Sequence, residues 1–278
     1  MPRAAHIRFA VLAAACVALA ATAAQAQLEA INQPPVVGGK DVMWVPTPDA
    51  AVDRMLSIAN VGPRDLVYDL GSGDGKIAIM AARRFGARAV GVEFDSDMIE
   101  RSRAAAQKEG VADRVRFVQA DIFGYDFRDA TVVTLYLLTS LNVKLRPKIL
   151  DMKPGTRVAS HMFRMEEWEP DEQVRVGASE IYLWVVPAQV AGTWVMTRGA
   201  GAAAELVFDQ RFQRISGSVR IAGETLPLTQ ALLRGDEIRF AFAGEGGARL
   251  AFTGRVAGDR IIGDRSAEPW SAVRVRAR

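Results

Sequence analysis

The sequence predicts an α/β fold with a parallel sheet, followed by a small all-β domain that forms a barrel or a sandwich. Between residues 64 and 161, short apolar runs alternate with helical segments, which is typical of a sheet covered by helices on both faces. A Gly-x-Gly-x-Gly turn at 71–75 joins the first strand to a helix. After Pro187, strand-like runs follow one another without a helical period. We therefore expect one domain at 46–187 and another at 192–278.

The first 26 residues have the features of a secretory signal peptide. Arg3 and Arg8 precede an apolar run at 9–24, and the sequence AQA at 24–26 fits a small-x-small cleavage site. The run is short for a membrane-spanning helix, which needs about 20 apolar residues. We expect export to the periplasm, or membrane anchoring if the segment is not cleaved. A linker with Pro and Gly residues follows at 27–45.

Composition restricts the kinds of site that the chain can build. The 278 residues carry a formal charge of +3, and their basic residues are interspersed with acids, so no polybasic tail predicts a nucleic-acid partner. Cys16 lies within the signal peptide, and His161 is the only histidine beyond it. One histidine without cysteine is poorly suited to zinc or a transition metal, so we expect no metal site.

The elements of the first domain follow in order from their periodicity and end signals. A helix at 47–60 is expected to begin with Thr47 as its cap and Pro48 in its first turn. A basic amphipathic helix is expected after Thr139, with its charged face in solvent or against an acidic protein surface or lipid headgroups. The other predicted helices are 75–86 and 96–110, and the strands are 65–71, 87–93, 115–121, 131–138, 156–162 and a terminal hairpin of 174–177 with 180–187.

The second domain contains apolar runs separated by turn residues at 192–199, 204–210, 215–223, 236–244 and 249–263. It carries no motif for a cofactor or a metal. We expect it to position the enzyme by binding an envelope partner or the acceptor protein.

Three predicted loops place ligand-binding groups at one edge of the first sheet. Gly71, Gly73 and Gly75 allow backbone conformations and approaches that a Cβ would block. Glu93 ends the second strand, where a carboxylate can accept hydrogen bonds from both hydroxyls of a ribose, and Asp121 ends the third. A tight structural turn and two helix caps are the alternative for these groups taken singly, but the three together indicate a nucleotide site.

The spacing of the glycines distinguishes between nucleotide cofactors. A dinucleotide site usually has the spacing Gly-x-Gly-x-x-Gly, which receives a pyrophosphate. Here the spacing is Gly-x-Gly-x-Gly, and Asp69 precedes it. A carboxylate suits a cationic group such as the amino group of a methionine moiety better than it suits a phosphate. The pattern therefore favours S-adenosylmethionine (SAM) over NAD.

Several motifs resemble those of a known family. DLGSGDGK, VGVEFD and ADIF are similar to class I methyltransferases. WVPTP, RFGARAVGVE, DATVVTLYLLTSLNVKLRPKI and KPGTRVASHMF, together with Trp168, resemble archaeal broad-specificity protein-lysine methyltransferases. They also resemble the mitochondrial relatives that methylate a lysine of the ATP synthase c-subunit. The resemblance covers about 44–186 and implies a Rossmann-like seven-strand sheet, with its last strand antiparallel, that binds SAM.

The resemblance also implies roles for individual residues. Glu93 would bind the ribose, and Asp121 with Ile122 would flank the adenine. Trp44 to Thr47 would close over the cofactor. The methionine end would be lined by Asp69, Gly71, Ser72, Gly73, Asp74 and Gly75.

The acceptor side is expected at the end of the fourth strand, where few groups titrate. A lysine nucleophile must be neutral, and losing its proton at pH 7 costs roughly 4–5 kcal/mol from a pKa near 10.4. An apolar channel lowers that pKa because it disfavours the charged form. Tyr136 is expected to orient the amine, and His161 to contact the substrate or act as a base. A core strand and a structural histidine are the alternative roles.

These observations predict a SAM-dependent methyltransferase that acts on a protein lysine, in the cell envelope if the chain is exported. A small-molecule or lipid methyltransferase is one alternative, and a non-catalytic binding module with a SAM fold is another. Peripheral membrane contact is compatible with the basic helix. The predicted export separates the enzyme from the cytoplasm, where SAM is made. The sequence does not specify an oligomeric state.

Overall fold

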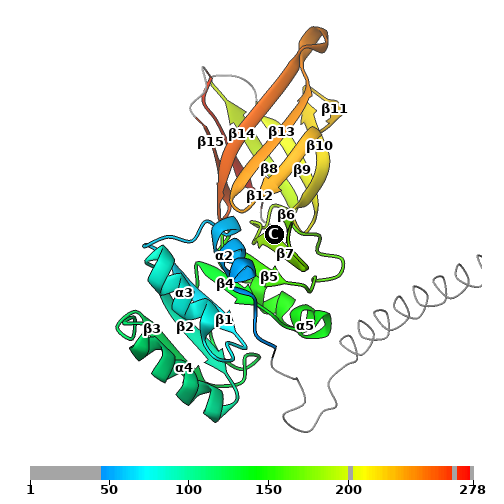
Figure 1. The fold of residues 1–278 in the computed structure, drawn as a ribbon. Helices are drawn as coiled ribbons and strands as arrows, with labels where there is room; N and C mark the ends of the chain where they lie inside the picture. The colour runs from blue at the N-terminus through cyan, green and yellow to red at the C-terminus, as the bar shows by residue number, and fades with distance from the viewer. Residues whose placement is uncertain (1–44, 200–202, 265–267, 276–278) are drawn as a thin grey trace, which may run out of the picture.

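The structure is a computed structural model, and the residues described from it are 45–199, 203–264 and 268–275 (Figure 1). The expected signal peptide at 1–26, with Cys16, lies outside the described residues. So do Trp44 and all of the expected linker except Val45. No helix within the described residues is both long and apolar enough to span a membrane.

The first part of the chain forms a seven-stranded mixed sheet in the order β3-β2-β1-β4-β5-β7-β6 (Figure 1). The first five strands in this order are parallel, and β7 pairs antiparallel with both β5 and β6. This arrangement confirms the predicted Rossmann-like sheet. The strands are β1 (Leu66–Leu70), β2 (Arg88–Glu93), β3 (Val115–Gln119), β4 (Val132–Leu135), β5 (Arg157–His161), β6 (Glu172–Val176) and β7 (Ser179–Val185).

Helices cover both faces of this sheet because each presents an apolar side to it. The helices are α2 (Asp49–Ile58), α3 (Lys76–Phe85), α4 (Ser96–Lys108) and α5 (Thr139–Leu150). Buried residues of α2, α3 and α4 share one core with Val67, Ala89 and Val132 of the sheet. Buried residues of α5 share the opposite core with Leu70, Val92 and Leu135. Burial on both faces explains the nearly continuous apolar runs of these strands.

The helix ends show one correct and one wrong cap prediction. Gly86 ends α3 with a φ of 72°, which a glycine adopts readily. The expected cap Thr47 does not cap α2, because Pro48 occupies the N-cap position and no side chain bonds the helix end. Thr47 is instead buried, and its carbonyl oxygen accepts a hydrogen bond from Nζ of Lys76 at 2.9 Å.

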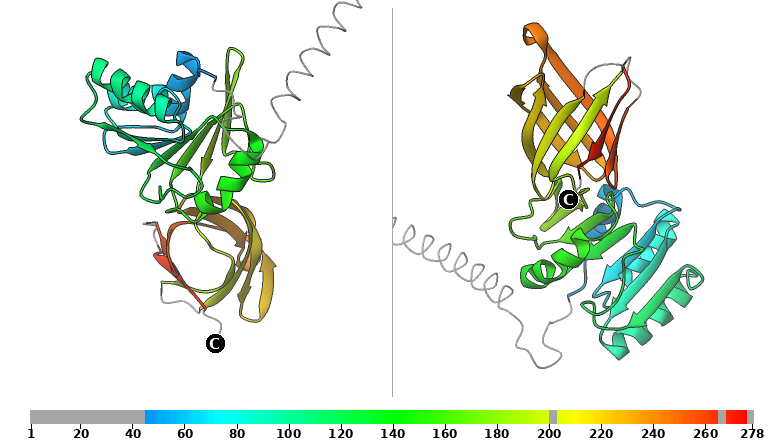
Figure 2. Two further views of the ribbon diagram at one scale, coloured as in Figure 1. Left: turned by 90° about the horizontal axis from the view of Figure 1, so that it is seen from below. Right: turned by 180° about the vertical axis from the view of Figure 1, so that it is seen from behind.

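The second part is a nine-stranded antiparallel sheet in the order β11-β10-β9-β8-β16-β15-β14-β13-β12. It curls into a nearly closed barrel, as the end-on view shows (Figure 2, left). This confirms the small all-β region and decides between barrel and sandwich. Its strands are β8 (Gly192–Arg198), β9 (Ala204–Arg211), β10 (Arg214–Ile221), β11 (Glu224–Pro227), β12 (Thr229–Arg234), β13 (Glu237–Ala243), β14 (Arg249–Ala257), β15 (Arg260–Gly263) and β16 (Trp270–Arg274), with a short 3-10 turn at Glu245–Gly247.

Side chains fill the barrel. Phe240 lies at the centre of an aromatic cluster, with ring centroids 5.6 Å from Phe208, 5.4 Å from Phe252 and 5.5 Å from Trp270. All four rings are buried in one core. Aromatic pairs at these separations stabilise a core beyond the area that they bury.

The barrel touches the first sheet through the ends of two hairpins. In the hairpin between β12 and β13, Arg234 pairs with Glu172 of β6 at 2.6 Å. The carbonyl oxygen of Gly235 accepts a hydrogen bond from the backbone N–H of Ala188 at 2.8 Å. A Cβ at Gly235 would lie 3.1 Å from the Cα of Gly155, so glycine allows the backbones to approach closely. The hairpin between β9 and β10 makes the second contact.

Candidate functional site

The turn from β1 to α3 is built on glycines that other residues could not easily replace. Gly71, Gly73 and Gly75 have φ values of 75°, 52° and 80°. A Cβ at Gly75 would lie 2.5 Å from the ring of Phe117, and a Cβ at Gly91 would also lie 2.5 Å from it. The turn therefore carries no side chains at its glycines, and its backbone lies close to the neighbouring strands.

Asp69 lies at the base of this turn with one oxygen unpaired. Its exposed fraction is 2%, and Oδ1 accepts a hydrogen bond of 2.7 Å from the hydroxyl of Thr134. Oδ2 is buried without a hydrogen-bond partner among the described residues. Burial raises the pKa of Asp69 to about 7, with smaller contributions in the same direction from the charges of Asp74 and Glu93. A cation next to Oδ2 would satisfy this carboxylate.

The turn also holds Ser72 and Asp74. The hydroxyl of Ser72 is buried and has no hydrogen-bond partner in the described part of the chain. Oδ1 of Asp74 accepts a hydrogen bond of 3.2 Å from the backbone N–H of Lys76 at the start of α3. Lys76 in turn binds the carbonyl oxygen of Thr47, which brings the segment before α2 to the glycine turn.

Glu93 connects the end of β2 to the glycine turn. Oε2 accepts a hydrogen bond from the backbone N–H of Gly73 at 2.9 Å. Oε1 accepts from the N–H groups of Phe94 at 2.8 Å and Asp95 at 3.0 Å. A carboxylate has about four acceptor positions, so Glu93 retains capacity for the hydroxyls of a ligand. It also fixes the turn that it borders.

Asp121 and Ile122 follow β3 at the same edge of the sheet. The backbone N–H of Ala120 donates to the carbonyl oxygen of Glu93 at 2.9 Å, which brings the two strand ends together. Asp121 is exposed, and its Oδ1 accepts a hydrogen bond from the N–H of Phe123 at 2.9 Å. Ile122 is half-buried and packs against the core on the α5 side.

Tyr136 and His161 form the other end of the site, after β4 and at the end of β5. Their ring centroids lie 4.2 Å apart, and Phe163 lies 6.1 Å from Tyr136. His161 is 2% exposed, and neither ring nitrogen has a partner among the described residues. Burial lowers the pKa of His161 to about 4 and raises that of Tyr136, so both rings are neutral at pH 7.

The register of the parallel strands places the two ends on one face of the sheet. Asp69 is paired with Thr134, and Thr134 is paired with Ala159. His161 lies two residues beyond Ala159, so its side chain is on the same face. Buried polar groups with unused bonding capacity therefore occur at β1 and β5, on either side of β4.

These groups fit SAM. Oδ2 of Asp69 has no partner within the described part of the chain and can accept a hydrogen bond from an ammonium group, and the glycines add no side chains to the turn. Glu93 and Asp121 lie at successive strand ends. Their carboxylates can accept hydrogen bonds from the hydroxyls and the amino group of the cofactor. The remaining groups are His161, which is buried, and Tyr136, which is half-buried.

The residues that hold the site in place were not among those predicted from the sequence. Thr134 bonds Asp69, and the fully buried Asn142 donates to the carbonyl oxygens of Phe163 and Arg164 at 3.3 and 3.4 Å. A threonine inside the apolar run VVTL, and an asparagine inside a helix, were the available signals. Each is a polar group placed where a core is expected, and such groups need partners.

The basic residues of α5 form a solvated face only in part, since Lys144 is exposed as predicted, whereas Arg146 and Lys148 are half-buried. Nζ of Lys144 lies 3.8 Å above the ring centroid of Phe123. Lys148 bonds the carbonyl oxygen of Tyr125, and Arg146 bonds that of Met165 at 2.8 Å. These side chains tie α5 to the loops on either side of the site, because their cations meet carbonyl oxygens and an aromatic face. Within the described ranges, no group of three or more His, Cys, Asp or Glu residues could hold a metal ion.

Comparisons with known proteins agree with this geometry. The model of the ANTKMT methyltransferase domain family matches residues 69–172. A protein-lysine N-methyltransferase of Saccharolobus islandicus is 45% identical over 151 residues, which are 52% of this chain and 94% of the relative. A lysine N-methyltransferase of Caenorhabditis elegans, named for the ATP synthase C-subunit, is 29% identical over 49% of this chain and 74% of its own length.

A solved structure is also similar. It is described as an RNA methyltransferase from Salinibacter ruber in complex with S-adenosyl-L-homocysteine. It is 51% identical, covers 52% of this chain and 96% of its own, and superimposes with a TM-score of 0.52. S-adenosyl-L-homocysteine is SAM without its transferable methyl group.

Proposed function

We infer that Tyr136 and His161 receive the amine of a lysine in an acceptor protein. The premise is that this chain belongs to the SAM-dependent protein-lysine N-methyltransferases. The observation that carries this assignment of residues is that neither ring nitrogen of the buried His161 has a hydrogen-bond partner among the described residues, while its ring centroid lies 4.2 Å from that of Tyr136. A neutral imidazole has one acceptor nitrogen, and a lysine amine can donate a hydrogen bond to it.

SAM supplies a methyl group on a positively charged sulfur, so the protein does not have to activate it. Asp69 holds the cationic amino group of the cofactor, and Glu93 its ribose. The glycine turn brings backbone close without adding side chains. The contribution of the protein to the rate is then alignment and exclusion of water.

The acceptor side keeps the lysine amine neutral. Leu137 is 8% exposed, and Tyr136 and His161 are neutral at pH 7. Apolar walls disfavour an ammonium ion, so the lysine releases its proton to bulk water before the methyl group is transferred to it. A neutral His161 ring accepts a hydrogen bond from the amine and adds no positive charge beside it. The Tyr136 ring limits the positions that the amine can occupy.

RNA is the acceptor named for one similar structure, and this chain offers little support for it. Nucleic-acid affinity depends mainly on Lys and Arg side chains that contact phosphates. In α5, Lys144, Arg146 and Lys148 are engaged with groups of the protein itself. A protein lysine therefore remains the acceptor that we propose.

We also propose that the enzyme acts in the cell envelope, because residues 1–26 read as a signal peptide. At that location the acceptor is also a component of the envelope, which the enzyme reaches directly or along the membrane surface. Fractionation of cells that produce the full chain and a chain with Arg3 and Arg8 changed to Glu tests the location. Enzyme that stays in the cytoplasm with the native segment would refute it.

The acceptor can be identified with isotopically labelled SAM. A cell-envelope extract is incubated with the full chain or with Asp69→Ala, and labelled bands are analysed by mass spectrometry. The proposal predicts label on lysine side chains of a protein, and none with Asp69→Ala. Label that is found only in lipid or small molecules would exclude a protein acceptor.

A further inference from the structure

The tip of one barrel hairpin packs against the core of the methyltransferase sheet. β9 and β10 are joined by the two-residue turn Phe212-Gln213, between the paired residues Arg211 and Arg214. Phe212 is half-buried and packs against the core on the α5 side. It lies outside the residues 69–172 that the family model matches. A residue of the barrel therefore completes a core of the catalytic part.

The partner of Phe212 is Trp168, in the loop that follows the acceptor side of the site. The two rings are stacked, with centroids 5.9 Å apart and an interplanar angle of 17°. Trp168 is fully buried, and its carbonyl oxygen accepts a hydrogen bond of 2.7 Å from Nε1 of Trp184. Without the Phe212 ring, one face of this buried tryptophan would lose its cover.

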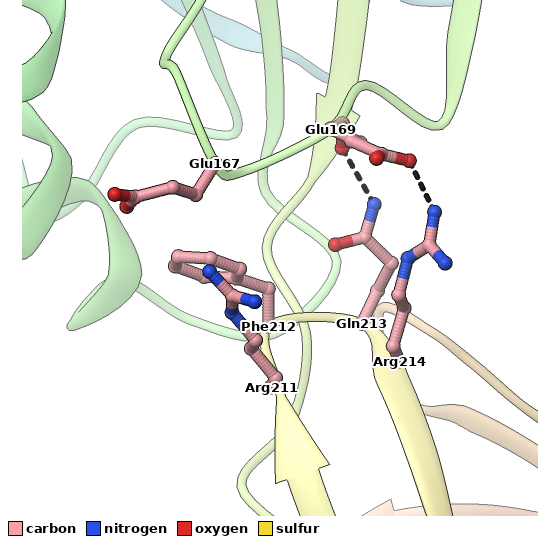
Figure 3. A pocket seen from close by; sticks show the side chains of 6 residues that line it. All are labelled: Glu167, Glu169, Arg211, Phe212, Gln213 and Arg214. Carbon is pink, nitrogen blue, oxygen red and sulfur yellow. Dashed lines mark hydrogen bonds and ion pairs between the residues drawn. The ribbon is translucent and has the colours of Figure 1, made fainter.

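Polar contacts fix the same hairpin to the same loop. Figure 3 shows Glu167 and Glu169 facing Phe212, Gln213 and Arg214 across a small pocket. Nε2 of Gln213 donates to the carbonyl oxygen of Glu169 at 2.7 Å, and Arg214 pairs with its carboxylate. The loop is thus held at its far end by a stacked ring, a hydrogen bond and an ion pair.

The near end of the loop forms the acceptor side. Phe163 stacks near Tyr136, and its carbonyl oxygen accepts hydrogen bonds from Asn142 and from the hydroxyl of Ser160 at 2.7 Å. Arg146 joins the two ends, because its Nη1 donates to the carbonyl oxygen of Met165 and its guanidinium carbon lies 5.5 Å from the Phe212 ring centroid.

The backbone of Phe212 has a strained conformation. Its φ is 55°, in the left-handed region that favours Gly or Asn over an aromatic residue. The conformation of the turn does not by itself require an aromatic residue at this position. The contact that the ring makes with the first sheet is its stacking on Trp168.

We propose that the β9–β10 hairpin is a fixed part of the acceptor side and that Phe212 is a positioning residue for the loop 162–170. Its ring holds Trp168, and the loop then holds Phe163 against Tyr136. The hairpin does not contact the glycine turn, Asp69 or Glu93 in any hydrogen bond, ion pair or ring contact of the described residues. Its loss should therefore affect the acceptor and spare SAM. The expected effect on an acceptor rests on the function proposed above.

The test replaces Phe212 by Asn, which suits the turn but lacks the ring, and by Tyr, which keeps the ring. Ala222→Asn is the matched control, because Ala222 has a φ of 50° in the two-residue turn Ala222-Gly223 between β10 and β11. In Phe212→Asn we expect kcat/KM for a polylysine peptide to fall about tenfold, while the Kd for SAM changes less than twofold. Phe212→Tyr and Ala222→Asn should match the unaltered chain.

Hydrogen exchange tests the positioning role independently of any acceptor. Amides of 163–169 should exchange at least tenfold faster in Phe212→Asn, while amides of 66–70 in β1 stay unchanged. If Phe212→Asn does not fold, Phe212→Leu is measured in the same way, since it retains an apolar cover but no ring plane. Unchanged exchange in the loop, or a parallel loss of SAM affinity, would overturn the proposal. A chain that methylates no lysine but shows the expected exchange would refute only the proposed acceptor.

Discussion

The hydroxyl of Thr134 donates a hydrogen bond of 2.7 Å to Oδ1 of Asp69, while Oδ2 is buried and accepts no hydrogen bond from any described residue. The contact crosses from β4 to β1 and links the cofactor end of the site to the strand that leads to Tyr136. A buried carboxylate with one free oxygen is unfavourable without a ligand, which makes it sensitive both to SAM and to pH.

Asp69→Asn should weaken SAM binding about a hundredfold, which corresponds to about 2.7 kcal/mol. The amide has the shape of the carboxyl group but no charge for the ammonium group of SAM. The affinity of the unaltered chain should also rise as the pH increases through about 7, because Asp69 becomes ionised there. Calorimetry at several pH values measures both effects. Equal affinity of the two proteins would remove Asp69 from the site.

The same carboxyl group predicts the opposite pH dependence for the stability of the ligand-free chain. The pKa of Asp69 is about 7 in the folded protein, against a usual value of 3.8, so the folded state binds the proton more tightly. Its contribution to the free energy of unfolding is full below about 4 and is lost as the pH rises through about 7. Denaturant unfolding over this range should show that loss, and Asp69→Asn should lack it. An identical pH dependence in both proteins would contradict the raised pKa.

Gly75→Ala should destabilise the chain by about 3 kcal/mol and abolish tight SAM binding. The added Cβ would meet the buried Phe117 ring at 2.5 Å, at a φ of 80°. Gly110→Ala is the control, because Gly110 has a φ of 69° but no atom within 4 Å of the added Cβ, and it should cost only about 1 kcal/mol. Equal losses in both variants would show that backbone strain, and not the approach to Phe117, determines the effect.

Strands with most of their residues buried could be predicted from the sequence, and the strands that were missed have few buried residues. β1, β2, β4 and β5 are buried on both faces and appear as apolar runs, so their order and type could be predicted. β11 has no buried residue, and the runs before and after it gave no signal for it. β12 and β16 were missed as well. β12 has one buried residue among exposed neighbours, and in β16 only Trp270 and Ala272 are buried.

The candidate site divides in a similar way. Gly71, Glu93 and Asp121 were assigned from their places at strand ends, a local property of the chain. The bond from Thr134 to Asp69 depends on the register of two strands 65 residues apart. The stacking of Phe212 on Trp168 depends on how the barrel docks, which no local pattern specifies.

His161→Phe should lower kcat by about a hundredfold with little change in the Kd for SAM, if the ring accepts a hydrogen bond from the lysine amine. Because burial lowers the pKa of His161 to about 4, the ring stays neutral through the usual range. The pH profile of kcat should therefore lack a step near 6.5, the ordinary value for histidine. Tyr136→Phe should also reduce turnover and spare SAM. Unaltered kcat in His161→Phe would show a purely structural role.

The central claim is that the acceptor is a protein lysine. The full chain is incubated with labelled SAM and, in separate reactions, with a polylysine peptide, total RNA and phospholipid vesicles, with Asp69→Ala as the background. Mass spectrometry of the products then locates the methyl group. We predict methyl groups on lysine side chains, absent with Asp69→Ala, and none above background on RNA or lipid. Methylation of RNA or lipid without any on lysine would contradict the claim.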